Sequence, residues 1–408
     1  MLEYFPDAKG ANYWPNHMFT MLVNCGLTVG DADEALAGAL AATRSGHNAP
    51  SAPFNSALVA GVRSKVERLE VQAADAERRG HVASASDMLF RAAVLLEQLD
   101  WQFWPWSSDE RKAPGGIFRH ARRTFRRAVE LADGTGASDG ARWIAIPFEG
   151  VELEGLFVPA RNPAAAGRAP VVVHLNGQHS SLHWHYQSGL PRLLAQRGVA
   201  SLLFDHPGVG AARYELGLKV RPDTESYAGA AIDWIERTAM GDAGRVGVIG
   251  GSLGGYRAPR AAAFEPRVKA AVAWGAHYEM YDSVGIDYPS VAPKIADGGP
   301  FSVDEQAVVE GLHFWAGTSS LADLDAMLRA LSLEGVMEKV RVPLLVVHGA
   351  NDAQLPLWHA ERTVAEATNS PRAELLKVDP TMGGDQHCNW DNPAFALHAM
   401  CDWLADVL

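Results

Sequence analysis

The sequence predicts an α/β protein in which a mostly parallel, doubly wound sheet follows an N-terminal helical domain. Apolar residues recur at helical spacing through roughly the first 140 residues, whereas short continuous apolar runs alternate with helix-compatible segments in the rest of the chain. Such alternation is typical of a parallel sheet covered by helices on both faces. One apolar run ends in glycines around a serine, which indicates a functional turn at a strand end.

The composition is that of an ordinary globular protein. The chain has 408 residues, of which 48% are hydrophobic and 21% charged, and this length favours a main domain with accessory structure. The net charge of -12 argues against a nucleic-acid partner. Neither a secretory signal nor a membrane-spanning stretch is recognisable, so we expect a cytoplasmic protein with no membrane partner. The three cysteines are widely separated, which favours neither disulfides nor a zinc module.

The first predicted domain spans residues 1–140 and is helical. One helix is expected to end at Gly80 and a second to begin near Ser86. The first helix is marked by a single apolar stripe, made of Leu58, Val62, Val66, Leu69, Ala73 and Ala76. An aromatic segment follows, with Trp101, Phe103, Trp104 and Trp106. These rings either pack in a core or line an apolar substrate pocket, and their number also raises the expectation of a homodimer.

The second predicted domain spans residues 141–408 and begins after the glycine-rich segment 133–140. It opens with a hairpin around Glu149 and Gly150. Further strands are predicted at residues 171–175, 200–204, 246–249, 270–274, 344–347 and 375–378. The alternation is interrupted at about residues 277–337, and an insertion between two core strands is well placed to act as a lid.

Ser252 is the candidate nucleophile. Gly250-Gly251-Ser252-Leu253-Gly254 fits the pattern G-x-S-x-G, in which the glycines let a helix start close against the preceding strand. The serine of this pattern sits on a strained turn with its hydroxyl group exposed. The preceding residues are strand-like and the following ones are helix-compatible, which is the context that the pattern requires.

A nucleophilic serine needs a base and an acid that orients the base. Asp352 follows the predicted strand at 344–347 in a turn, and His387 lies in the loop before the last predicted helix. The chain order serine, aspartate, histidine agrees with the order of this fold type. Asp385 is a competing acid, but it lies only two residues from His387, which is too local to support the ring well.

Two backbone N–H groups are expected to stabilise an oxyanion. Leu253, directly after the serine, supplies one of them. The second is expected from Gln178 or its neighbour, where the chain leaves the strand at 171–175 through a glycine.

Histidines near strand ends are candidates for substrate contacts. His179, His183 and His185 form the densest histidine cluster, but two of them lie only two residues apart, so we expect no metal site and assign His179 to substrate binding. His206 follows another strand end and is assigned in the same way. His277, Tyr278 and Glu279 open the lid insertion and are also expected to contact substrate; a surface carboxylate is the alternative for Glu279.

With these residues identified, the region 141–408 resembles an α/β-hydrolase. The resemblance is carried by His-Leu-Asn-Gly-Gln178, Asp-His-Pro-Gly-Val-Gly210, Gly-Gly-Ser252-Leu-Gly, His-Gly-Ala-Asn-Asp352 and Gly-Asp-Gln-His387. The helical front end, residues 83–93 and the ending Gly-Gly-Asp-Gln-His-Cys are similar to a narrower group. That group contains 2,6-dihydroxypseudooxynicotine hydrolase and the fungal pigment hydrolases that shorten a polyketide.

The resemblance implies cleavage of a carbon–carbon bond beside a ketone, with the substrate held between the helical domain and the core. It gives Ser252, Asp352 and His387 the triad roles, and a further lid-entry acid of the group falls near Glu279. The expected function is therefore a cofactor-independent serine hydrolase of an aromatic or polyketide-like small molecule. A carboxylesterase or lactonase with the same residues is the alternative, because esterases share the helical front end. A non-catalytic, ligand-binding homologue is the third possibility.

Overall fold

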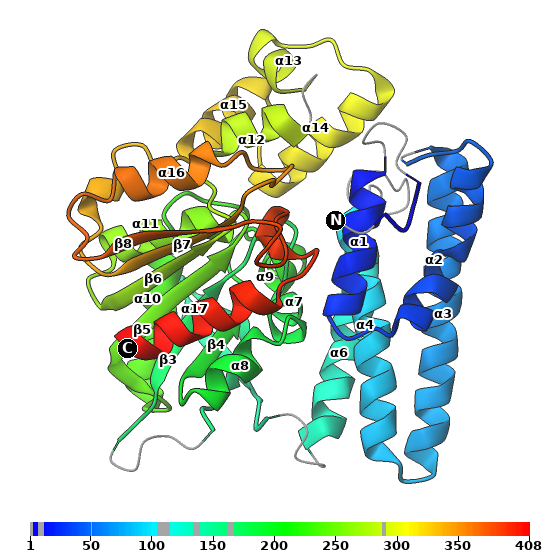
Figure 1. Cartoon of the computed structure of the whole chain (residues 1–408), viewed down its shortest axis with the longest axis horizontal. Helices are drawn as coiled ribbons and strands as arrows, with labels where there is room; N and C mark the ends of the chain where they lie inside the picture. Colours follow the sequence, from blue (N-terminus) through cyan, green and yellow to red (C-terminus); the bar gives the residue numbers. More distant parts are fainter. Residues whose placement is uncertain are drawn as a thin grey trace. The chain divides into compact units, whose positions relative to one another are not determined.

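The computed structural model of the chain describes residues 3–6, 12–49, 51–103, 115–133, 139–161, 167–287 and 291–408. The chain forms two compact units, Met1–Ala141 with Trp390–Asn392, and Arg142–Asn389 with Pro393–Leu408 (Figure 1). Trp104, Trp106 and residues 134–138 of the predicted boundary segment lie outside the described residues. Within the described ranges, no helix is both long and apolar enough to cross a membrane.

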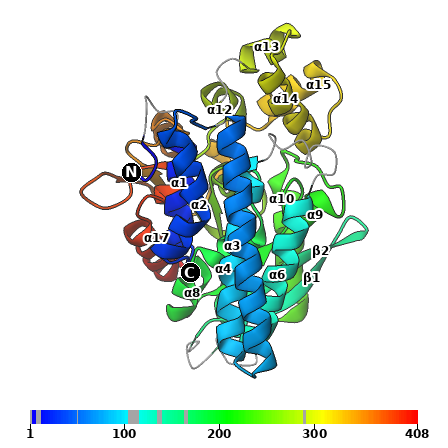
Figure 2. The same cartoon turned by 90° about the vertical axis from the view of Figure 1, so that its right-hand side faces the viewer.

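The first unit is built from long helices packed side by side (Figure 2). Helix α3 packs between α2 and α4, and α6 packs along α4. The helices are α1 Tyr13–Asn24, α2 Val29–Arg44, α3 Ala52–Arg78, α4 Val82–Phe103 and α6 Gly116–Asp133. The two predicted helices occur as α3 and α4, but α4 begins before Ser86. Ser86 is inside the helix, where its hydroxyl group donates a hydrogen bond of 2.9 Å to the carbonyl of Ala128.

Five of the six residues of the apolar stripe predicted for α3 are buried, and the sixth, Ala76, is partly buried. Leu58, Val62, Val66, Leu69 and Ala73 each expose at most 3% of their surface. At the end of α4, Trp101 packs edge-to-face on Trp14, with ring centroids 5.3 Å apart. For Trp101, this packing favours the core interpretation of the aromatic segment.

The described part of the second unit contains an 8-stranded sheet in the order β1-β2-β4-β3-β5-β6-β7-β8. Strands β1 and β2 pair antiparallel, as do β2 and β4, and the remaining neighbours are parallel. The strands are β1 Arg142–Phe148, β2 Val151–Val158, β3 Pro170–Leu175, β4 Ala200–Phe204, β5 Asp242–Gly251, β6 Val268–Trp274, β7 Leu344–Gly349 and β8 Ala373–Val378. Each predicted strand is present, and the sheet is mostly parallel as predicted.

Helices cover both faces of this sheet. Helices α8 Leu190–Gln196 and α17 Ala394–Val407 lie on one face, and α10 Thr224–Thr238 and α11 Gly254–Phe264 lie on the other (Figure 1). Every residue of β4 and β7 is buried. This burial explains why those strands are continuous apolar runs in the sequence. Shorter helices in the same unit are α7 Leu182–Gln187, α9 Gly210–Tyr214 and α16 Trp358–Ala365.

The insertion between β6 and β7 is helical. Its helices are α12 Met280–Asp287, α13 Val291–Asp297, α14 Val303–Ala316 and α15 Leu321–Ala330, followed by the short turn η1 Met337–Lys339. Helix α14 starts with a capping box in which Ser302 and Glu305 bind each other's backbone N–H groups. A helix was predicted here from Glu305 onward. Helices α12 and α13 were not predicted, because the glycines and prolines around them are typical of loops.

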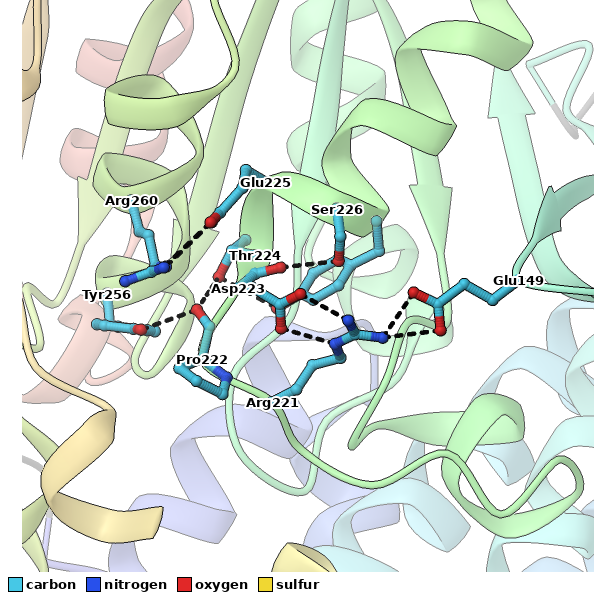
Figure 3. A network of polar contacts seen from close by, with 10 residues as sticks. Glu149, Arg221, Pro222, Asp223, Thr224, Glu225, Ser226, Tyr256 and Arg260 are labelled. Carbon is cyan, nitrogen blue, oxygen red and sulfur yellow. Dashed lines mark hydrogen bonds and ion pairs between the residues drawn. The ribbon is translucent and has the colours of Figure 1, made fainter. Parts of the chain in front are cut away.

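A polar network links α10 to the helix that follows Ser252 (Figure 3). Arg221 donates two hydrogen bonds of 2.6 Å to the carboxylate of Asp223 and two of 2.9 Å to that of Glu149. In the first turn of α10, Glu225 forms a bidentate ion pair with Arg260 of α11, at 3.0 Å for both contacts. Such paired geometry adds specificity to the packing of α10 against α11.

Candidate active site

Ser252 lies in a sharp turn between β5 and α11. Its φ of 58° is in the left-handed region, which residues other than glycine rarely adopt. The neighbouring glycines make this turn possible, because a Cβ at Gly250 would collide with the carbonyl of Gly254, and a Cβ at Gly254 with the carbonyl of Leu175. The sequence G-x-S-x-G therefore folds here as the strained strand-to-helix turn that the pattern predicts.

Asp352 and His387 meet beyond the end of β7. His387, in the short turn His387–Asn389, donates from Nδ1 to Asp352 Oδ2 at 2.8 Å. The other carboxylate oxygen accepts backbone hydrogen bonds from Gln354 and Leu355 at 2.8 and 2.9 Å. Because the carboxylate is buried and held by these bonds, it fixes the orientation of the imidazole ring.

Attraction between the two groups outweighs the effect of burial on both. Burial disfavours each charged form, but the carboxylate of Asp352 raises the pKa of His387 well above its ordinary value. Burial likewise opposes ionisation of Asp352, yet His387 keeps the pKa of that carboxyl group below its ordinary value. His348 adds to the second effect, since its Nε2 lies 3.7 Å from Asp352 Oδ2. The site thus holds an ionised carboxylate next to a basic imidazole.

The end of β6 contacts both the turn that carries Ser252 and the segment that carries His387. The N–H of Ser252 donates to the carbonyl of Trp274 at 2.8 Å, and Cys388, next to His387, donates from Sγ to the same carbonyl at 3.5 Å. A Cβ at Gly275 would lie 3.5 Å from Cε1 of His387. His387 Nε2 is buried and has no hydrogen-bond partner in the described part of the chain. The nitrogen that faces away from Asp352 is therefore available to accept a proton.

The two predicted oxyanion donors flank the serine. A Cβ at Gly177 would lie 3.2 Å from Cβ and 3.8 Å from Oγ of Ser252, so the loop that carries Gln178 packs directly on the serine. Leu253 begins the first turn of α11. Among the described residues, neither the N–H of Gln178 nor that of Leu253 donates a hydrogen bond. Both groups are therefore available as donors, and their role in binding an oxyanion stays a prediction.

The histidines predicted to contact substrate have other partners in the structure. His179 has a φ of 57°, and its Nδ1 lies 2.9 Å from Nη1 of Arg213. Burial and then Arg213 lower the pKa of His179 well below its ordinary value. His206 is fully buried, and its Nε2 accepts a hydrogen bond of 3.0 Å from the backbone N–H of Asn176. The assignment of both histidines to substrate binding stays a prediction.

Among the three lid-entry residues, His277 is the one that interacts electrostatically with the Asp352–His387 pair. Its Nε2 and Ser283 Oγ share a hydrogen bond of 2.7 Å. Burial, followed by repulsion from His359 and His387, lowers the pKa of His277 well below its ordinary value. His277 is therefore a neutral side chain next to the imidazole of His387.

Tyr278 and Glu279 interact with groups outside this cluster. The hydroxyl group of Tyr278 donates to Glu366 at 2.6 Å, and the guanidinium of Arg362 lies 4.3 Å from the centre of its ring. Burial and a hydrogen bond with Asp282 raise the pKa of Glu279 to about 7. A carboxyl group that is partly protonated near neutral pH can donate a proton, but its contact with substrate stays a prediction.

Arg257 was not singled out in the sequence, yet it is fully buried in α11. A charged residue within the Ala-rich helix after Ser252 was the sequence feature that could have pointed to it.

Asp385, the competing acid, accepts a hydrogen bond from the side chain of Asn351 and so stabilises the loop that carries Asp352. Among the described residues, no three His, Cys, Asp or Glu side chains are placed to hold a metal ion.

Comparisons with known proteins identify the family. A sequence model of the prolyl oligopeptidase family matches residues 190–406, a region that includes the turn at Ser252 and the Asp352–His387 pair. The chain is 28% identical over 344 residues to 2,6-dihydropseudooxynicotine hydrolase of Paenarthrobacter nicotinovorans, which covers 82% of this chain and 81% of that protein. It is 31% identical over 308 residues to the hydrolase LUC6 of a Fusarium species, covering 69% of this chain and 72% of that one.

The solved structure of 2,6-dihydroxy-pseudo-oxynicotine hydrolase has the same fold. It matches with a TM-score of 0.71 over 96% of this chain and 95% of that chain, at 23% sequence identity. This match confirms the predicted α/β-hydrolase fold with an N-terminal helical region. The chain is therefore a hydrolase of the α/β-hydrolase superfamily and belongs to the prolyl oligopeptidase family.

Proposed function

We propose that the protein is a serine hydrolase that cleaves a carbon–carbon bond next to a ketone in an aromatic or polyketide-like small molecule. Ser252 is the nucleophile, His387 the base, and Asp352 the acid that orients the base. The observation that best supports this proposal is the buried hydrogen bond between His387 and Asp352, with the unpartnered Nε2 next to the turn that carries Ser252.

The proposed reaction begins when Ser252 Oγ bonds to the ketone carbon. Its proton passes to His387 Nε2, and the π electrons of the carbonyl group move onto oxygen, where the N–H groups of Gln178 and Leu253 stabilise the charge. The carbon–carbon bond then breaks, and its electron pair leaves with an electron-rich ring or an enolisable fragment, which takes a proton from His387. Water, deprotonated by His387, finally attacks the acyl-enzyme and releases a carboxylic acid.

The choice of a carbon–carbon bond rests on similarity. The match to 2,6-dihydropseudooxynicotine hydrolase spans 82% of this chain, and the resemblance to that group implies cleavage beside a ketone. A carboxylesterase or lactonase would use the same residues, because the acyl-enzyme and its hydrolysis are identical after bond cleavage. The proposal includes no cofactor, a small molecule as the substrate, a cytoplasmic location and a possible homodimer.

A matched pair of substrates tests the proposal. A dihydroxyphenyl alkyl ketone and the phenyl ester of the same acyl group differ in the bond that is broken but give the same acyl-enzyme. We expect the wild-type protein to release the dihydroxyphenyl fragment and the acid from the ketone, measured by chromatography, and Ser252→Ala to release neither. Rapid cleavage of the ester with no cleavage of the ketone would instead identify an esterase.

The activity is expected to fall as the pH falls. His387 must be neutral to accept the serine proton. Because its pKa is raised, the imidazole loses its own proton only at a pH above about 6.5, the ordinary imidazole pKa. A plot of kcat/KM against pH should therefore rise through one titration with a midpoint above that value. Asp352→Asn should move the midpoint to lower pH, because the carboxylate that raises the pKa is gone. A wild-type midpoint clearly below 6.5 would show that the group being titrated is not this histidine.

A further inference from the structure

Arg257 is a buried cation without an acidic partner. It lies on α11, one turn and a half beyond the serine, and exposes none of its surface. In the described part of the chain, no carboxylate lies within ion-pair distance of its guanidinium, and its Nε and Nη2 atoms have no hydrogen-bond partner. A buried charge is costly unless it forms compensating interactions, so the bonds that Arg257 does form are informative.

Those bonds go to the loop that carries the predicted oxyanion donor. Arg257 Nη1 donates to the backbone carbonyl of Asn176 and, at 3.3 Å, to that of Gly177. Arginine retains its charge in proteins, so these are charge-assisted hydrogen bonds, which are stronger than neutral ones. Their target is a segment about 80 residues away in the sequence.

The geometry of the peptide bond relates the carbonyl of Gly177 to the N–H of Gln178. These two groups belong to one planar trans peptide and point in opposite directions. A donor that holds the carbonyl therefore also sets the direction of the N–H. The N–H of Gln178 donates no hydrogen bond in the described structure, and the same loop packs against Ser252.

The start of the loop is fixed separately. The N–H of Asn176 donates to His206 Nε2, and the side-chain amide of Asn176 donates to the carbonyl of Phe204, both at 3.0 Å. These bonds hold the N–H and the side chain of Asn176, but neither involves the Gly177–Gln178 peptide. Among the described residues, Arg257 is the one that donates a hydrogen bond to the carbonyl of Gly177, within the Gly177–Gln178 peptide.

We propose that Arg257 is a positioning residue that orients the Gly177–Gln178 peptide so that the N–H of Gln178 points at the oxyanion. The inference rests on the proposed function, because it requires an oxyanion formed by attack of Ser252. The guanidinium acts through the peptide and touches neither the substrate nor the reacting atoms.

Arg257→Ala, Arg257→Lys and the control Arg260→Gln test this role. Arg260 lies on the same helix and pairs with Glu225 of α10 (Figure 3). With para-nitrophenyl acetate, we expect Arg257→Ala to lower kcat about a hundredfold, as the loss of one oxyanion donor does, with little change in KM. Arg257→Lys should lose less, since it keeps the charge, and Arg260→Gln should stay within about threefold of wild type in kcat, because the contacts of Arg260 go to Glu225 and not to the loop at 176–177.

Two further readouts separate positioning from structural damage. Trifluoroacetophenone adds to the serine to give a bound oxyanion, so its inhibition constant should rise in Arg257→Ala by the same factor by which kcat/KM falls. Guanidinium chloride at millimolar concentration should restore part of the activity. If Arg257→Ala does not fold, the same comparison of the inhibition constant with kcat/KM is made in Arg257→Lys.

The outcomes distinguish this inference from the proposed function. If kcat is unchanged in both Arg257 variants, or falls without a matching change in the inhibition constant, the positioning role is wrong. If Ser252→Ala retains wild-type turnover of para-nitrophenyl acetate, the proposed function itself is wrong, whatever the Arg257 variants do.

Discussion

Replacement of Ser252 by alanine is expected to lower kcat by about 10⁴-fold to 10⁶-fold, the range typical for loss of a catalytic serine. The variant should fold normally, because serine already occupies the left-handed turn with a φ of 58° and alanine brings no additional backbone strain. The measurement is steady-state turnover together with the melting temperature. A normal melting temperature would assign the loss to chemistry.

Cys388→Ala is the matched control for this prediction. Cys388 is the other nucleophilic side chain beside the imidazole, but its Sγ is buried and donates to the carbonyl of Trp274. We expect this variant to remain within about tenfold of wild type, a loss attributable to packing. Full activity in Ser252→Ala combined with loss in Cys388→Ala would assign the nucleophile to the cysteine.

The second large effect is expected for Asp352→Asn, with a fall in kcat of about 10⁴-fold. The amide is nearly the same size as the carboxylate, so the burial of the site is retained. However, an amide nitrogen facing His387 Nδ1 favours the tautomer that carries its proton on Nε2, and that nitrogen then cannot accept the serine proton. Steady-state kinetics with the substrate used for Ser252→Ala measures the effect.

Asp385→Asn is the appropriate comparison, because Asp385 was the competing acid in the sequence. Its carboxylate accepts a hydrogen bond from Asn351 in the structure, so we expect a loss of no more than about tenfold through the loop. If Asp385→Asn were the more damaging of the two substitutions, the acid of the triad would have to be reassigned.

Much of the fold could be predicted because each central strand is a short, mostly apolar run of consecutive residues that is recognisable without knowledge of its neighbours in space. The runs that became β4 and β7 are buried at every position and apolar at most of them, with Ser201 and His348 as the polar exceptions, since both of their faces are covered. The turn at Ser252 was predictable for a similar reason. A side chain at either Gly250 or Gly254 would collide with backbone of the turn or of the end of β3. Both positions therefore require glycine, and the requirement is visible in the sequence as the short pattern G-x-S-x-G.

The remaining features depend on contacts between distant segments. In the sequence, Arg257 is one residue of a helix, and its contacts with the carbonyls of residues 176 and 177 exist only in the folded chain. His206 follows a strand end, which predicts a role at the site, but its hydrogen bond to the N–H of Asn176 depends on the parallel pairing of β3 with β4. Glu279 likewise owes its raised pKa to burial and to Asp282 within the insertion. Helices α12 and α13 were missed because local composition gave the opposite indication.

The central claim is that Ser252 is an activated nucleophile. Its most direct test is the intact mass of the protein after treatment with a fluorophosphonate, compared with Ser252→Ala under the same conditions. A single adduct on the wild-type protein, located at Ser252 by peptide mapping, and none on the variant is the predicted result. An adduct on both proteins would assign the activated nucleophile to a side chain other than Ser252. An adduct on neither would contradict the activation of Ser252 and return the non-catalytic homologue to consideration.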